Sequence, residues 1–318
     1  MRTGRTPRSA HPALAALAVV SLSLAACGDD GGDAVSAESD APATDAPAET
    51  APPDDGGAGP SRIVSLSPTH TEMMFAIGAG DLLVAVDDQS DHPAEVLDLP
   101  RDLSGFEPNV EAIAGYEPDL VVMGGDFTGL GEQLDALGIE WWDGPAAQTL
   151  DDTYAQIEQL GEVTGHGTNA DELVASMQRE IDEIVASTPD PAAPLAVYHE
   201  LDPSYYSVDS TTFIGTLYAM LGLENIADQA DGDAGGYPQL NAEFIVSADP
   251  DLVFLADTEC CGESAETVAA RPGWDAIAAV QNGGVVEMSD DIASRWGPRV
   301  VDYLAAVSRA VQTAGDSA

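Results

Sequence analysis

Short apolar runs alternate with amphipathic stretches along most of the chain from residue 61 onward. Such runs predict buried strands, and apolar residues three and four positions apart predict helices. The predicted strands cover residues 62–66, 83–86, 119–123, 139–142, 195–198, 251–255 and 284–288. The predicted helices cover residues 69–76, 109–116, 133–137, 211–221, 241–247, 265–280 and 298–313. This alternation favours α/β structure, with mainly parallel strands covered by helices on both faces.

The alternation is interrupted in the middle of the chain, where two helical patterns follow each other without a strand between them. They cover residues 150–163 and 169–187, and the second has an Asn at its start and an apolar stripe along one face. Prolines at positions 189, 191 and 194 end this region. We therefore expect two α/β lobes separated by a helical connector.

An internal repeat supports the two lobes. Residues 109–123 and 241–255 are identical at seven of fifteen aligned positions, and each copy predicts an Asn-capped helix, a Pro-Asp turn and a buried strand. Each copy also carries a glutamate at the start of its helix, Glu111 or Glu243. A glutamate there stabilises the helix through its dipole, so both residues have a structural explanation beside any functional one.

The charge balance narrows the classes of function. The chain has 56 Asp and Glu residues against 10 basic residues, all of them Arg, and a formal net charge of −46. The lack of lysine in the sequence excludes a P-loop nucleotide site and pyridoxal chemistry, because both depend on a lysine amine. A chain this negative repels a phosphate backbone, so we expect no nucleic-acid partner.

The first residues have the pattern of an export signal. Three arginines precede an apolar stretch over residues 12–26, which is too short to span a membrane. The stretch ends in Leu-Ala-Ala-Cys27, which resembles the lipobox of bacterial lipoproteins. This resemblance implies that residues 1–26 are a lipoprotein signal peptide and that Cys27 carries lipid such as palmitate; a plain signal peptide cut nearby is the alternative. Residues 27–60 then form the lipidated cysteine and a disordered acidic tether.

Three groups of residues together resemble the iron-siderophore and cobalamin (Fe/B12) family of ABC-importer substrate-binding proteins. They are Arg-Ile-Val-Ser-Leu-Ser-Pro-Thr-His-Thr-Glu at 62–72, the two repeat units, and Ser-Arg-Trp-Gly-Pro-Arg at 294–299. The resemblance implies a class III periplasmic-binding-protein fold, in which two Rossmann-like lobes are joined by a single long α-helix. On this basis the domain covers residues 61–318, with an N-lobe at about 61–148, connecting helices at about 149–188 and a C-lobe at about 194–318.

The same resemblance implies an extracytoplasmic solute-binding subunit that is lipid-anchored at the cell membrane. Such a protein captures an iron-siderophore, haem or corrinoid-type ligand between its lobes and delivers it to a permease dimer with its ATPase. In the family an acidic residue on each lobe docks onto arginines of the permease, and Glu111 and Glu243 match these positions. The family also implies a monomer that is not an enzyme and has no cofactor or metal of its own.

The ligand should lie beyond the carboxyl ends of the strands, as it does in open α/β sheets. The candidate ligand-binding residues at these ends are Thr69, Gln89, His92, Phe106, Tyr206, Tyr237, Arg295 and Trp296. Aromatic side chains provide flat apolar area for a macrocycle or an aryl chelate, and Arg295 can hold a carboxylate or phosphate. Tyr237 falls where cobalamin-binding relatives carry an aromatic residue, whereas Gln89 and His92 depart from the pattern of those relatives.

Two adjacent cysteines, Cys260 and Cys261, follow a predicted strand at the cleft. Free thiols are vulnerable outside the cell, so a vicinal disulfide between them is plausible chemistry for this location. It would form either an apolar plate on the pocket wall or a loop brace without ligand contact.

Two further classes of function stay open. A zinc or manganese receptor needs three or four convergent ligands, whereas His70, His92 and His199 are more simply explained as hydrogen-bonded loop residues. A secreted α/β hydrolase needs a catalytic nucleophile, but the sequence has no Gly-x-Ser-x-Gly motif and no Ser, His and acid placed as a triad.

Overall fold

The computed structural model describes residues 59–189, 191, 193–230 and 234–317. The chain divides into two units, Met1–Asp55 and Gly56–Ala318, and all described residues belong to the second unit. The expected signal peptide, Cys27 and nearly all of the expected tether lie outside the described residues. Within the described part of the chain, no helix combines the length and the apolar character needed to span a membrane.

The first sheet has four parallel strands in the order β2-β1-β3-β4. Their bounds are β1 Ile63–Ser65, β2 Leu83–Val86, β3 Leu120–Met123 and β4 Glu140–Asp143. The central strands β1 and β3 are buried along their whole length, as expected of parallel strands covered on both faces. The helices of this part, which we call the N-lobe, are α1 Pro68–Ala76, α2 Val110–Ala114 and α3 Leu130–Leu137.

The second sheet repeats this topology, with parallel strands in the order β6-β5-β7-β8. Its strands are β5 Ala196–Glu200, β6 Glu224–Asn225, β7 Leu252–Leu255 and β8 Val285–Glu287. The helices of this part, which we call the C-lobe, include α6 Phe213–Met220, α7 Ala242–Ala248, α8 Thr258–Cys261 and α11 Asp290–Ser294. Short 3-10 turns lie at Gly80–Leu82, Ala94–Asp98 and Ile226–Gln229. The matching strand order confirms the two α/β lobes expected from the alternation and the repeat.

The sequence repeat has the same structural role in both lobes. Asn109 and Asn241 cap α2 and α7 by accepting hydrogen bonds from backbone N–H groups of the first turn. Asp119 and Asp251 each accept a backbone N–H at the start of the first strand of their lobe, at 3.0 and 2.8 Å. Several of the identical residues are therefore those that build each helix-strand unit.

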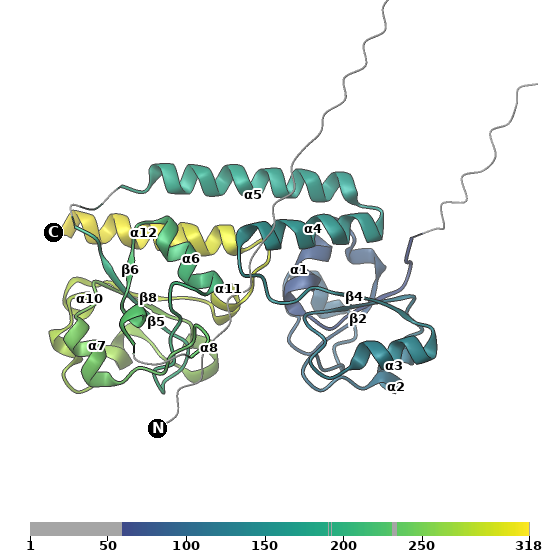
Figure 1. Cartoon of the computed structure of the whole chain (residues 1–318), viewed down its shortest axis with the longest axis horizontal. Helices are drawn as coiled ribbons and strands as arrows, with labels where there is room; N and C mark the ends of the chain where they lie inside the picture. The colour runs from purple at the N-terminus through teal and green to yellow at the C-terminus, as the bar shows by residue number, and fades with distance from the viewer. Residues whose placement is uncertain (1–58, 190, 192, 231–233, 318) are drawn as a thin grey trace, which may run out of the picture. The chain divides into compact units, whose positions relative to one another are not determined.

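Two helices connect the lobes, α4 Leu150–Thr164 and α5 Gly167–Ser187. Figure 1 shows α5 lying along both α4 and the C-terminal helix α12 Val300–Ser317, which it contacts. α5 has 21 residues, which at the usual rise per residue makes it about 31 Å long. The predicted Asn start of this helix is wrong, because α5 begins at Gly167. Asn169 instead donates from Nδ2 to the carbonyl oxygen of Ile77 at 2.8 Å and so ties α5 to the end of α1.

The predicted helix over residues 265–280 is broken into α9 Ala265–Ala269, a 3-10 turn Trp274–Ala276 and α10 Ala278–Asn282. Pro272 disrupts the helix, and Gly273 adopts a φ of 82°, a left-handed conformation that glycine takes without strain. The sequence did not predict β6 and α8. Both elements are too short to show a hydrophobic period.

Candidate functional site

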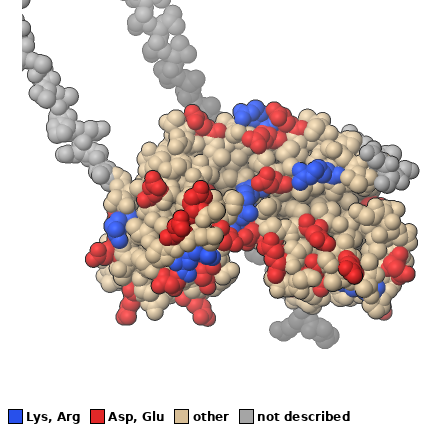
Figure 2. Space-filling model, turned by 180° about the vertical axis from the view of Figure 1, so that it is seen from behind, with Lys and Arg blue, Asp and Glu red and all other residues tan. Residues whose placement is uncertain are grey.

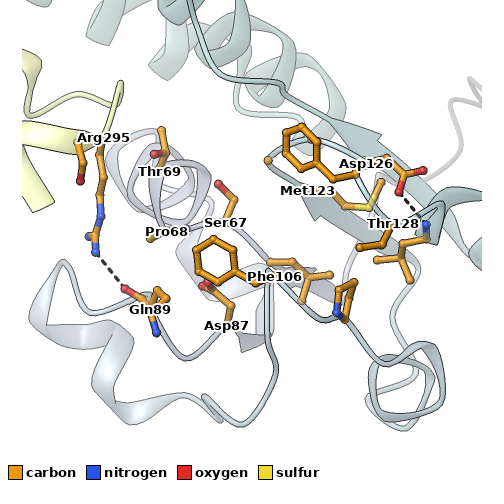
Figure 3. A pocket seen from close by; sticks show the side chains of 18 of the residues that line it. Ser67, Pro68, Thr69, Asp87, Gln89, Phe106, Met123, Asp126, Thr128 and Arg295 are labelled. Atoms are coloured by element: carbon orange, nitrogen blue, oxygen red, sulfur yellow. Dashed lines mark hydrogen bonds between the residues drawn. The ribbon is translucent and has the colours of Figure 1, made fainter. Parts of the chain in front are cut away.

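A cavity of about 570 Å³ opens at the carboxyl ends of the N-lobe strands. Its walls are the segments that follow β1, β2 and β3, the loop 105–108, and α11 of the C-lobe with the two residues after it. Figure 3 shows Arg295 and Gln89 at one end, Met123 and Asp126 at the other, and Phe106 between them. The cavity thus has the position that ligands take in open α/β sheets.

Two phenylalanines in the cavity wall are almost fully exposed. Phe106 is 79% exposed and Phe127 is 89% exposed, more than any other large apolar side chain among the described residues. Two exposed rings at one cavity form an apolar surface that a flat ligand can cover. Phe127 is not among the ligand-binding residues predicted from the sequence; its only signal there is its position just after a buried strand and the glycines 124–125.

The floor of the cavity is closely packed. A Cβ at Gly105 would lie 2.5 Å from the carbonyl oxygen of Leu66, so glycine is what lets this loop approach the end of β1.

Behind the floor, the buried His70 has Nδ1 2.8 Å from Ser67 Oγ and Nε2 3.0 Å from Gln156 Oε1. Burial lowers the pKa of His70 to about 4, so its neutral ring links α1 to α4.

The structure brings five of the predicted ligand-binding residues to the cavity: Thr69, Gln89, Phe106, Arg295 and Trp296. Trp296 is fixed in the wall, because its Nε1 donates to Gln156 Oε1 at 2.9 Å. His92 instead lines a separate hollow of about 480 Å³ beside Arg299. Tyr206 and Tyr237 are 41% and 51% exposed on the C-lobe and are not among the residues that line the cavity. Contact of any of the eight predicted residues with a ligand stays a prediction.

Arg295 is surrounded by acceptor oxygen atoms. Its side chain is only 7% exposed, and Nη1 donates to Glu72 at 2.8 Å and to Asp91 at 2.9 Å. Nη2 donates to the carbonyl oxygen of Gln89 at 3.0 Å and to Asp291 at 2.5 Å. From the sequence, this guanidinium was predicted to hold an anionic ligand; in the structure, four oxygen atoms of the protein already accept hydrogen bonds from it.

Arg299 completes a group of charges that joins the two lobes. Its Nε donates to the Glu72 carboxylate at 2.8 Å, so Glu72 is shared by both arginines. We call Glu72, Asp91, Asp291, Arg295 and Arg299 the interlobe ion cluster; its first two members belong to the N-lobe and the others to the C-lobe. Burial raises the pKa of Asp291 to about 6, and the nearby carboxylate of Asp91 adds to this effect.

A second arginine lies at the carboxyl ends of the C-lobe strands. Arg271 donates to both oxygen atoms of Glu200, at 2.7 and 2.5 Å, and to Glu263 at 2.7 Å. Its guanidinium also lies 4.6 Å from the ring centre of Trp274. Both carboxylate oxygens of Asp257 are buried without a hydrogen-bond partner within the described part of the chain. Burial, reinforced by the charges of Glu200 and Glu263, raises the pKa of Asp257 to about 7.

Cys260 and Cys261 are paired through their Sγ atoms, with Cα atoms 3.8 Å apart, and both are exposed on α8. The Asp290 carboxylate holds α8 by accepting from the backbone N–H groups of Glu259 and Cys260 at 3.1 and 2.8 Å. Neither cysteine is among the residues that line the cavity. A contact between this pair and a ligand stays a prediction.

The three histidines considered as metal ligands differ in burial: His70 and His199 are buried, whereas His92 is exposed. His199 is buried and its Nδ1 lies 2.7 Å from the Tyr218 hydroxyl, while burial lowers the pKa of His199 to about 3. His92 is exposed in its separate hollow. Among the described residues, no three His, Cys, Asp or Glu side chains converge as a group that could hold a metal ion.

Acidic side chains outnumber arginines on the visible face of the molecule (Figure 2). Figure 2 shows them spread over the visible face, with few arginines between them. Glu111 and Glu243 are both exposed in the first turns of α2 and α7. The two repeat glutamates are therefore accessible to a partner, one on each lobe.

The chain is similar in sequence and in fold to known binding proteins. Residues 63–292 match the sequence profile of the family described as periplasmic binding protein. The chain is 30% identical over 261 residues to the uncharacterized ABC transporter substrate-binding lipoprotein YvrC of Bacillus subtilis, across 79% of this chain and 80% of that one. The crystal structure of the periplasmic vitamin B12 binding protein BtuF of Vibrio cholerae is similar with a TM-score of 0.66 and 26% identity, across 80% of this chain and 98% of that one.

A haem-binding protein has the same fold. The periplasmic heme binding protein HutB of Vibrio cholerae is similar with a TM-score of 0.68 and 25% identity, across 78% of this chain and 97% of that one. These similarities confirm the expected fold class of two Rossmann-like lobes joined by a long helix.

Proposed function

This chain belongs to the periplasmic binding protein family, and on that premise we propose that it is the extracytoplasmic solute-binding subunit of an ABC importer. The proposed ligand is an iron-siderophore, haem or corrinoid-type compound, and the proposed partners are a permease dimer and its ATPase. Relatives named as vitamin B12 and heme binding proteins motivate this ligand class. The observation that carries the proposal is the cavity at the strand ends, with two exposed phenylalanines in its wall.

The proposed ligand lies against Phe106 and Phe127, because an exposed aromatic ring offers flat apolar area to a metal complex. Tyr206 and Tyr237 are the proposed counterparts on the C-lobe, since both are exposed aromatic residues. The cavity volume of about 570 Å³ falls in the range that small-molecule sites occupy in proteins.

The proposed docking residues for the permease are Glu111 and Glu243. Their support is that each is exposed at the start of an equivalent helix, one in each lobe. A permease built of two equivalent subunits presents the same surface twice, and two equivalent acidic positions match that symmetry.

The proposed anchor is a lipid on Cys27. Residues 1–26 are the proposed signal peptide and 27–60 the proposed tether, with lobes at about 61–148 and about 194–318. The Leu-Ala-Ala-Cys sequence supports the anchor, and the relative in Bacillus subtilis is named a lipoprotein. A multiply acylated cysteine binds a membrane stably, whereas a single chain does so only marginally.

Phe106→Ala and Phe127→Ala should each weaken ligand binding about tenfold, because each removes an aromatic surface worth about 1.4 kcal/mol against the ligand. Calorimetry with cyanocobalamin, haem and ferric siderophores identifies the ligand and measures the loss. Leu137→Ala is the matched control, because it removes an exposed apolar side chain from α3 that does not line the cavity. Failure of every compound to bind the wild-type protein would overturn the proposed function; unchanged affinity of both Phe variants would overturn the proposed site.

A further inference from the structure

Few basic side chains are available to bind a ligand at the cavity. The chain has no lysine, and its ten basic residues are all arginines. The described part of the chain holds seven of them: Arg62, Arg101, Arg179, Arg271, Arg295, Arg299 and Arg309. Arg295 is the one arginine among the described residues that line the cavity. Its availability therefore decides whether the cavity can bind an anion.

The guanidinium of Arg295 is already bound by acceptors within the protein. Its two Nη groups donate to three carboxylates, Glu72, Asp91 and Asp291, and to one backbone carbonyl. Arg299, the other cation of the interlobe ion cluster, is bound to the same Glu72. Two guanidinium groups thus face three carboxyl groups, so the cluster has no excess positive charge. A ligand carboxylate could bind Arg295 only by displacing a partner that is already seated.

The remaining charged residues of the cavity wall are acidic. Asp87 and Asp126 line it together with Asp291. The two oxygen atoms of Asp126 accept from the backbone N–H groups of Leu130 and Gly131 at 2.7 and 3.1 Å. The carboxylate of Asp126 therefore already occupies the start of α3, where an anion would otherwise bind. Three carboxyl groups against one arginine give the wall an acidic balance.

One feature of the wall favours an anion, and it is weaker. The first residues of α1, Pro68 and Thr69, line the cavity. A helix N-terminus carries a partial charge of roughly +0.5. Pro68 has no N–H to donate. This partial positive charge is smaller than the net negative charge of the wall, where Asp87, Asp126 and Asp291 stand against one arginine.

At the strand ends of the C-lobe, the arginine found among the described residues, Arg271, is not free to bind a ligand. Arg271 is bound to Glu200 and Glu263, and the buried Asp257 lies in the same charged surroundings. Arg271 and Arg295, both in the C-lobe, are thus paired with carboxylates inside the protein. Arg101 of the N-lobe donates from Nη2 to the carbonyl oxygen of Asp88 and is not among the residues that line the cavity. A negative ligand between the lobes would therefore find that Arg271, Arg295 and Arg299 are already bound to carboxylates of the protein.

Resting on the proposed function, we propose that this protein selects metal complexes that carry no net negative charge. The favoured class is a bulky, uncharged or cationic complex whose metal is already fully coordinated, such as a ferric trihydroxamate or a corrinoid. The exposed phenylalanines bind its apolar face. The disfavoured class comprises catecholate and carboxylate chelates and haem with its two propionates, because their charge is repelled and finds no counter-ion.

Calorimetry with probes of graded charge tests this selection. The probes are uncharged cyanocobalamin, uncharged ferrichrome, cationic ferrioxamine B, anionic haem and trianionic ferric enterobactin. At least one uncharged or cationic probe should bind, and each anionic probe should bind at least about a hundredfold more weakly than the tightest of these. Tight binding of an anionic probe, equal to or better than all the others, would overturn the selection while leaving the proposed function intact.

A charge inserted into the wall separates electrostatics from shape. Thr128→Lys places a cation on an exposed lining residue, and it should strengthen binding of the anionic probes by about fivefold or more and weaken binding of ferrioxamine B. Gln178→Lys on the exposed face of α5 is the control. It changes the net charge by the same amount, but Gln178 is not among the residues that line the cavity. If both lysine variants act alike, or if neither moves the anionic probes, the wall does not set the charge preference and the inference is wrong. If no probe binds wild type or variants, the proposed function fails, and the selection fails with it.

Discussion

At the scale of single residues, Asp257 has the most sharply defined consequence for stability. Its carboxyl group is buried with no hydrogen-bond partner among the described residues, and burial raises its pKa to about 7. An unfolded Asp titrates at about 3.9, so between about pH 4 and 7 the folded state binds more protons than the unfolded state. The contribution of Asp257 to stability therefore falls as the pH rises through this window, and the full penalty applies above it.

Asp257→Asn should relieve that penalty, because asparagine does not ionise. The variant should gain about 1–3 kcal/mol more in unfolding free energy, relative to wild type, at about pH 8 than at about pH 5. Urea unfolding at both pH values measures this difference. The unpaired amide of the new Asn costs the same at both, so it cancels.

Asp171→Asn serves as the control for this pH effect, because Asp171 is exposed on α5. It should show the same unfolding free energy, relative to wild type, at both pH values. An Asp257→Asn gain that does not depend on pH would show that Asp257 is ionised at no cost in the folded protein.

At the scale of elements, the equivalent helices α2 and α7 carry the proposed docking charges. Charge reversal at both, Glu111→Arg with Glu243→Arg, should abolish uptake in cells that carry the importer. Ligand affinity should stay within about twofold of wild type, because exposed charges outside the cavity act on docking rather than on the pocket. Uptake of a radiolabelled ligand and calorimetry of the purified variant measure the two effects separately.

The matched control for docking is the pair Glu158→Arg and Glu172→Arg, which makes the same change of net charge on exposed positions of α4 and α5. This pair should transport normally. Uptake that survives reversal of the helix-start glutamates, or that is lost equally in the control pair, would contradict the docking role.

Elements with a local cause could be predicted from the sequence. The Asn caps, the Pro-Asp turns and the buried strands of the repeat depend on neighbouring residues, so their pattern is visible in a short stretch of chain. The predicted helix at 265–280 failed for a local reason as well, because Pro272 and Gly273 interrupt an apolar period that otherwise continues. The short elements β6 and α8 have too few residues for any period to show.

The site was less predictable, because its chemistry depends on distant contacts. An arginine near a cleft predicts an anion site, and the sequence does not show that Glu72 and Asp91 lie within reach of Arg295. Exposure is hidden in the same way. Phe127 has the same sequence signature whether it packs under a loop or stands in a cavity wall, and only the fold distinguishes the two.

At the scale of the whole folded unit, the interlobe ion cluster should couple the stabilities of the lobes. Glu72→Gln removes a carboxylate from two largely buried guanidinium groups, Arg295 and Arg299, so the unfolding free energy should fall by about 3 kcal/mol. Urea unfolding followed by tryptophan fluorescence measures the loss. Glu158→Gln on the exposed face of α4 is the control and should change it by less than about 0.5 kcal/mol. A loss no larger than that of the control would mean that the cluster contributes nothing to stability.

The cluster also bears on the order in which the protein is completed. Glu72 is separated from Arg295 by 223 positions and from Arg299 by 227. Because a chain is synthesised from its N-terminus, the carboxylate in α1 has no cation to meet until nearly the whole sequence exists. A carboxylate buried without a partner either takes up a proton or keeps its surroundings open to water. The N-lobe is therefore synthesised first, but Glu72 can form its ion pairs only after Arg295 and Arg299 have been made. A chain truncated before residue 295 should keep Glu72 without these partners and should be more sensitive to proteases than the full chain.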